Sequence, residues 1–375
     1  MHSVSLYIHI PWCMKKCPYC DFNSYTEKNK INEKKYIFLL MNDLEQDLNL
    51  INNKVIIQNI FIGGGTPSLF HINSIDLLLK EIHKRIEIAN NAEITIESNP
   101  TSMENKKILQ YNKIGINRIS LGIQTFNNTL LEKIGRNYTI NNIEKILTSI
   151  NFFKKKINFN IDLMYNLPDQ SYKEAMNDIK KAISFNPTHI SWYELTIEPK
   201  TVFFYKKLNL PNEYISEKIF LSGKKLLEKN NYIQYEVSSY SKIGYECQHN
   251  LNYWNFGDYL GIGCGAHGKI TQENKKVIRT IKFNNIKDYE QKMFLKKKYI
   301  VQKKELALEF FMNQCRIKKN ILKEDLYNKT GITPQNIQKK INKCITNNLI
   351  IEDSNSWKLT KKGYLFINSI LENFL

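Results

Sequence analysis

The sequence lacks the long apolar runs and the even set of cysteines that mark several protein classes. No stretch approaches the roughly 18 uninterrupted apolar residues that a membrane-spanning helix needs. The first residues show neither a basic leader nor a long apolar core, so no signal peptide is predicted and a cytoplasmic location is expected. Seven cysteines, an odd number, argue against a disulfide framework and favour metal binding or catalysis for clustered ones.

Acidic residues are also few: 36 Asp and Glu stand against 54 Lys and Arg, a net charge of +18 over 375 residues. Such a balance is typical of proteins that bind nucleic acid or acidic membranes. The basic residues are spread evenly among many Asn and Ile, however, which favours compositional drift over a binding patch. With 42% hydrophobic residues, the chain is expected to form one large or two ordinary globular domains.

Short β-branched runs alternate with amphipathic segments, the pattern of successive βα units. Strands are predicted at 5–10, 56–62, 93–98, 118–124, 158–165 and 189–195, and helices at 36–50, 75–88, 102–112, 141–153, 172–185 and 213–229. Six such units predict an α/β fold with a partial (β/α)6 barrel. In parallel barrels the chemistry gathers at the carboxyl ends of the strands, and the unusual residues of this sequence fall there.

The rest of the chain has a different pattern. Residues 232–269 read as irregular, aromatic-rich and Gly-rich, and the basic stretch 292–304 reads as a linker. The last part reads as three helices and a hairpin, like a winged helix. We therefore predict a barrel over 1–231, a barrel-covering segment with a linker over 232–304, and a small C-terminal winged-helix-like α+β domain over 305–375.

Cys13, Cys17 and Cys20 form a CxxxCxxC run just after the first predicted strand. A structural zinc site usually takes four ligands, and no fourth lies near by, although a distant His9 or Cys247 would complete a zinc knuckle. Three thiolates suit a 4Fe-4S cluster whose fourth iron stays open. With Tyr19 before the third cysteine, the run resembles the signature of the radical S-adenosylmethionine superfamily. That resemblance implies that S-adenosylmethionine (SAM) chelates the open iron and is cleaved to a radical after electron transfer.

A glycine turn, 63–65, follows the second predicted strand and matches the superfamily motif that holds the methionyl part of SAM. The segments 7–13, 63–68, 97–100, 117–126, 135–136 and 162–168 together resemble the oxygen-independent coproporphyrinogen III oxidase family. The resemblance implies that SAM is contacted by Tyr7, Tyr19, Gly64, Gly65, Thr66, Glu97, Gln124, Arg136 and Asp162. Carboxylates can accept hydrogen bonds from the ribose hydroxyls of SAM, and an arginine can pair with the SAM carboxylate.

Two branches of this family must be separated. The pattern of the decarboxylating oxidases is CxxxCxxCxC, with a fourth cysteine two residues after the third, whereas this chain has Cys20-Asp21-Phe22. The oxidases also carry a longer segment before the cysteines, whereas Cys13 lies near the first residue of this chain. The motif HNxxYW, 249–254, likewise resembles the haem-chaperone branch, called HemW. An imidazole can ligate haem iron and aromatic rings can stack on a porphyrin, so His249 is the predicted haem ligand. Cys247 is an alternative ligand, and a packed loop in which His249 bonds backbone is the competing interpretation.

The resemblance implies a haem chaperone with haem as cargo, acceptor haemoproteins and an electron donor as partners, and no coproporphyrinogen oxidase activity. The oxidase is the alternative function. A third is a nucleic-acid-binding or RNA-modifying radical SAM protein that uses the basic tail, but its basic residues do not gather on one recognition helix, so no nucleic acid is expected. The net charge is expected at most to attract haem propionates or an anionic membrane surface.

Overall fold

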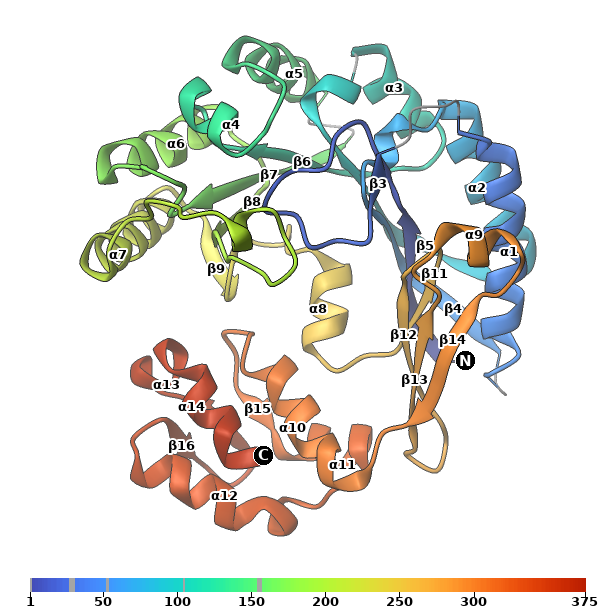
Figure 1. Cartoon of the computed structure of the whole chain (residues 1–375). Coiled ribbons are helices and arrows are strands. Elements are labelled where there is room, and N and C mark those ends of the chain that lie inside the picture. Colours follow the sequence, from blue (N-terminus) through green and yellow to red (C-terminus); the bar gives the residue numbers. More distant parts are fainter. Residues whose placement is uncertain (1, 27–30, 52–53, 104, 154–156) are drawn as a thin grey trace.

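The computed structural model describes residues 2–26, 31–51, 54–103, 105–153 and 157–375. Six parallel strands lie side by side in chain order and curve into an open barrel (Figure 1). They are β1 (His2–Ile10), β4 (Val55–Gly64), β5 (Glu87–Ser98), β6 (Arg118–Gln124), β7 (Asn158–Tyr165) and β8 (His189–Glu194). The predicted partial barrel is confirmed.

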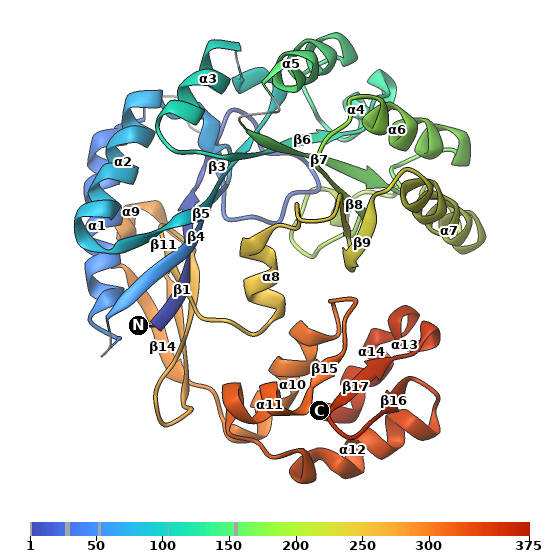
Figure 2. The ribbon, with the colours of Figure 1, turned by 180° about the vertical axis from the view of Figure 1, so that it is seen from behind.

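Helices cover the outer face of the curved sheet, as both views show (Figures 1 and 2). They are α1 (Glu33–Leu48), α2 (Ile72–Arg85), α3 (Asn105–Lys113), α4 (Asn128–Lys133), α5 (Ile140–Phe152), α6 (Tyr172–Ser184) and α7 (Glu213–Lys229). In α2 the buried residues Ile75, Leu78, Leu79 and Ile82 follow a helical period, so one apolar stripe faces the sheet. The predicted helices are confirmed within three residues at their ends, except that position 104 lies outside the described residues.

The prediction of irregular chain over 232–269 is wrong, because this part supplies strands to both ends of the sheet. Beyond β8 the sheet continues with β10 (Ser239–Ser241) and β9 (Ile233–Glu236). Beyond β1 it continues with β11 (Tyr259–Ile262), β12 (His267–Thr271) and then β13 (Val277–Lys282), which follows this part of the chain. The predicted linker is also wrong, since it contains the edge strand β14 (Leu295–Ile300). Lysines on an exposed edge strand prevent pairing with other chains, so their strand looks like a linker in the sequence.

The C-terminal unit has its own hydrophobic core, built around the buried rings of Phe311 and Trp357. It contains α10 (Lys303–Gln314), β15 (Ile321–Leu322), α11 (Lys323–Thr330), α12 (Pro334–Thr346), β16 (Ile350–Glu352), β17 (Ser356–Leu359), α13 (Lys361–Leu365) and α14 (Ile367–Leu371). The helices and hairpin predicted there are confirmed. In Figure 1 this unit lies below the open side of the barrel, with α8 (Gln248–Trp254) between the two. Within the described residues, no helix is both long enough and apolar enough to cross a membrane.

Candidate cofactor site

The cysteine loop follows β1 and spans the concave side of the barrel, as the dark-blue trace in Figure 1 shows. Its base is fixed by a short pairing of β2 (Trp12–Cys13) with β3 (Tyr25–Thr26). Cys13 is buried there, while Cys17 and Cys20 are half-buried and joined by a backbone hydrogen bond of 3.1 Å. The three thiols are thus held on one well-anchored loop.

The three cysteines line one cavity of about 330 Å³ inside the barrel. Of the other residues predicted from the sequence, the structure brings Tyr19, Gly64, Gly65, Thr66, Glu97, Gln124, Arg136 and Asp162 to its wall. Tyr7 and His249 are not on that wall; they lie behind it, with ring centres 6.3 Å apart. Phe22 lines the cavity and is 54% exposed, so the loop carries an apolar side chain at the rim of the cavity.

The glycine turn is bonded directly to the cysteine loop. The Gly65 N–H donates to the carbonyl of Ile10 at 2.8 Å, and the Thr66 N–H donates to the carbonyl of Trp12 at 2.7 Å. Gly64 has a φ of +112°, and a Cβ at this position would lie 2.6 Å from the His9 ring. Both the conformation and the space therefore require glycine.

A Gly64→Ala substitution is expected to lower the free energy of unfolding by more than the about 1–3 kcal/mol that backbone strain alone costs. The matched control is Gly115→Ala, because Gly115 also has a positive φ, +99°, but a Cβ there would meet nothing within 4 Å. Urea unfolding of both variants measures the difference. Equal losses would contradict the close packing of Gly64 against His9.

A chain of hydrogen bonds joins the cysteine loop to the glycine turn on the other side. Arg136 donates through Nη2 to the Tyr19 hydroxyl at 2.6 Å and through Nη1 to the side-chain Oδ1 of Asn99 at 3.0 Å. Asn99 in turn donates to the Thr66 hydroxyl at 3.0 Å. Sequence reasoning missed Asn99 as a site residue, although its place directly after β5 is a signal that could have found it.

Two carboxylates, Glu97 and Asp162, lie on the cavity wall. Glu97 accepts the Gly64 N–H at 2.9 Å, and Asp162 accepts from Ser120 at 3.0 Å and from Asn160 at 2.7 Å. Burial, followed by the charge of Asp162, raises the pKa of Glu97 to about 8. Burial also raises the pKa of Asp162. The site can therefore accept hydrogen bonds from hydroxyl groups while it holds one of these carboxyls protonated near neutral pH.

This raised pKa predicts a pH dependence of stability. Because the folded chain holds the Glu97 proton up to about pH 8, against an ordinary pKa of 4.5, wild-type stability falls as the pH rises between these values. Glu97→Gln removes this loss, so the variant should gain stability relative to wild type from pH 4.5 to 8. Urea unfolding in the absence of ligands across this range measures it. Parallel curves for the two proteins would contradict the raised pKa.

The HNxxYW motif forms most of α8 and presents two faces. His249 and Tyr253 are one turn apart and point toward the sheet, whereas Asn250 and Trp254 are one turn apart and line the cavity. His249 is 1% exposed; its Nδ1 lies 2.6 Å from the side-chain Oδ1 of Asn59 and its Nε2 lies 2.8 Å from the Tyr253 hydroxyl.

Both ring nitrogens of His249 therefore have protein partners, and they are side chains rather than the backbone groups of the competing interpretation. Burial lowers the pKa of His249 to about 3, so the ring is neutral. The haem-ligand role of His249 stays a prediction, and it requires the Tyr253 bond to open. Cys247 is fully buried beside Glu93 and lines no part of this cavity.

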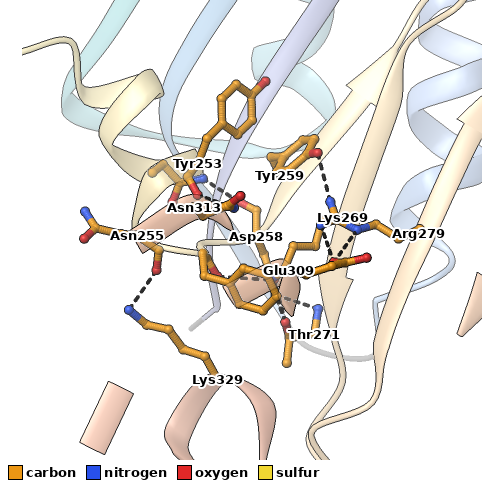
Figure 3. A network of polar contacts seen from close by, with 12 residues as sticks. Tyr253, Asn255, Asp258, Tyr259, Lys269, Thr271, Arg279, Glu309, Asn313 and Lys329 are labelled. Atoms are coloured by element: carbon orange, nitrogen blue, oxygen red, sulfur yellow. Dashed lines mark hydrogen bonds and ion pairs between the residues drawn. The ribbon is translucent and has the colours of Figure 1, made fainter. Parts of the chain in front are cut away.

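Hydrogen bonds and an ion pair connect α8, the sheet and the C-terminal unit (Figure 3). Asn313 of α10 donates to the Tyr253 carbonyl at 2.7 Å, and Lys329 of α11 donates to the Asn255 carbonyl at 2.8 Å. Arg279 of β13 pairs with Glu309 of α10 at 2.6 Å. Trp254 thus keeps its position at the cavity through contacts with both units.

The donor set fits a cluster better than a single ion. Among the parts of the chain that the structure describes, no three His, Cys, Asp or Glu side chains converge on a point that one metal ion could occupy. The ring nitrogens of His9, one of the two candidates for a fourth ligand in the zinc alternative, lie 2.9 Å from the Tyr7 hydroxyl and 2.8 Å from the Asn23 carbonyl. Burial raises the pKa of Cys13 and Cys20, and neighbouring thiolates add to it. Bound metal would favour the thiolate form of these cysteines.

Comparisons with known proteins identify the family of this chain. The model of the radical SAM superfamily matches residues 7–182, and the model of the HemN C-terminal domain matches residues 301–366. The chain is 54% identical to the haem chaperone HemW of Buchnera aphidicola subsp. Schizaphis graminum, over 99% of this chain and 98% of that one. It is 41% identical to the haem chaperone HemW of Escherichia coli K12 over the same shares. The chain belongs to the HemW family.

A solved structure supports the fold of this HemW-family chain. The coproporphyrinogen III oxidase HemN of Escherichia coli, a radical SAM enzyme, superposes with a TM-score of 0.85 over 100% of this chain and 90% of that one. At 20% identity this likeness shows the fold alone. The radical SAM fold predicted from the cysteine run and the strand order is thereby confirmed.

Proposed function

We propose that this chain is a haem chaperone that binds haem and passes it to acceptor haemoproteins. The carrying observation is its identity over nearly full length to relatives named haem chaperones, together with Phe22 where the oxidases have a cysteine. These relatives are named haem chaperones, and haem as cargo and haemoproteins as acceptors belong to this proposal. An electron donor for the cluster belongs to the same proposal.

In this proposal Cys13, Cys17 and Cys20 hold a 4Fe-4S cluster at the cavity. Tyr19, Gly64, Gly65, Thr66, Glu97, Gln124, Arg136 and Asp162 hold SAM beside it. The bound cluster would supply an electron to SAM. Tyr7 acts from behind the wall, where its hydroxyl lies 2.9 Å from His9 Nδ1 and thereby orients the ring that packs under Gly64.

The test is a haem titration of protein reconstituted anaerobically with iron, sulfide and SAM. A Soret shift that saturates at one haem per chain is expected, because the proposal assigns haem as stoichiometric cargo. Anaerobic incubation with coproporphyrinogen III is expected to yield no protoporphyrinogen IX. Steady formation of that product, or the absence of any stoichiometric Soret shift, would overturn the proposal in favour of the oxidase or of another function.

A further inference from the structure

A second cavity, of about 810 Å³, lies where the open edge of the barrel meets the C-terminal unit. Its volume lies in the upper part of the range of about 300–1,000 Å³ that ligand sites span. The C-terminal side is fixed by backbone pairing: Glu236 of β9 bridges to Ile317, and the Lys318 N–H donates to the Tyr235 carbonyl at 3.0 Å. Tyr193 and Ser238 line both cavities, so the two adjoin.

The charged groups of this second cavity are unbalanced. Lys224, Arg316, Lys318 and Lys361 line it, against Glu194 as the carboxylate among its lining residues. Lys224 has only a distant partner, Glu228 at 3.9 Å, and within the described chain no ion pair is formed by the other three. The buried Nε of Arg316 has no hydrogen-bond partner. Burial, followed by the neighbouring Lys224, lowers the pKa of Lys318 to about 8, so these ammonium groups crowd each other.

The remaining wall is aromatic and aliphatic. The rings of Trp192 and Phe220 stack within 8° of parallel, with centres 6.4 Å apart. Leu221 and Leu365 also line the cavity, yet they are 50% and 60% exposed. Apolar side chains left in contact with water beside excess cations favour a ligand that is largely apolar and negatively charged.

The geometry points to this second cavity as the cradle of the haem, with the two propionates on Lys224, Arg316 and Lys318 and the macrocycle against the Trp192 and Phe220 side. His249 does not line this cavity, so this placement replaces its predicted role as the haem ligand. The inference rests on the proposed function, since it assigns a place to a cargo that the function requires. It also gives the motif tryptophan a role. The Arg316 guanidinium of the cradle lies 4.4 Å from the centre of the Trp254 ring, and Trp254 lines the cysteine cavity, so this contact connects the two cavities.

The test compares haem affinity in the full chain by Soret titration. Lys224→Gln with Lys318→Gln is expected to weaken haem binding by about 30-fold or more, because charge-assisted hydrogen bonds are lost. The matched control is Lys225→Gln with Lys339→Gln, which removes the same charge from exposed positions of α7 and α12 and should leave the affinity unchanged. Circular dichroism establishes that both variants are folded.

A ligand change provides a test that depends on no variant. Haem dimethyl ester, which lacks the propionate charges, should bind wild-type protein more weakly by a similar factor. The difference between haem and its ester should be smaller for the Lys224→Gln, Lys318→Gln protein, since two of the three propionate partners are already gone. Equal affinity of wild type for haem and its ester, or equal weakening by the control pair, would overturn the cradle. Absence of haem binding by wild type would instead overturn the proposed function itself.

Discussion

A Cys17→Ala variant, reconstituted anaerobically with iron and sulfide, is expected to retain little iron and none of the visible absorption of a cluster. The reason is that three thiolates line the cavity and no other cysteine lies on its wall, so the loss of one leaves the cluster with two protein ligands. Wild-type protein is expected to hold about four irons and four sulfides per chain. Iron and sulfide assays with absorption spectra measure both.

The matched control for this prediction is Cys344→Ala. Cys344 lies on α12 in the core of the C-terminal unit, away from the cysteine cavity, and the substitution removes one thiol with little change of volume. This variant should keep the iron content of wild type. Retention of iron by Cys17→Ala, or equal loss in the two variants, would contradict the assignment of the loop as the cluster ligand.

Lys282→Ala is expected to lower the free energy of unfolding by about 3–5 kcal/mol, the usual cost of removing one partner from a buried ion pair. Lys282 of β13 is fully buried, and its Nζ lies 2.5 Å from a carboxylate oxygen of both Asp43 and Asp47 on α1. Asp43 also accepts the Gly263 N–H at 2.9 Å and the Tyr289 hydroxyl at 2.7 Å. Without the lysine, two carboxyls stay buried with no opposing charge.

Urea unfolding measures this loss against Lys298→Ala, which removes an exposed lysine from the adjacent strand β14. The control should change stability by less than about 0.5 kcal/mol. Below the ordinary carboxyl pKa values the loss in Lys282→Ala should shrink, because both acids are then neutral. A loss no larger than that of the control would contradict the role of this group in fastening β13 to α1.

Much of the barrel could be predicted because its parallel strands are buried on both faces and its helices are amphipathic. β6 is buried along its whole length, and its sequence places Ile119, Leu121 and Ile123 at alternate positions, the period of a strand. The convergence of the cysteines, the glycine turn, Glu97 and Asp162 followed from strand order alone. The carboxyl ends of neighbouring parallel strands meet at one edge, whatever the side chains between them.

The ends of the sheet could not be predicted in the same way. β10 has three residues and β14 is a lysine-rich edge, so neither carries the hydrophobic period by which a strand is recognised. The orientation of the HNxxYW motif was hidden for a different reason. Only a helix brings positions 249 and 253 to one face and 250 and 254 to the other, and no helical pattern marks this segment.

The second cavity lay beyond sequence reasoning because its cations come from distant segments. Lys224 belongs to α7, whereas Arg316 and Lys318 belong to the segment after α10. The same contacts change the interpretation of the basic tail. Lys323 pairs with Glu352 at 2.8 Å, and Lys329 pairs with Asp325 at 3.2 Å. These two lysines therefore form ion pairs within the C-terminal unit.

The central claim is that this chain carries haem and delivers it, and a transfer assay tests it most directly. Reconstituted protein loaded with one equivalent of haem is mixed anaerobically with an apo-haemoprotein, and the two are separated after timed intervals. Haem is expected to leave the chain and appear in the acceptor, faster than from an inert haem-binding protein at the same free haem concentration. Haem that stays on the chain, or that reaches the acceptor no faster than from the inert carrier, would contradict the claim.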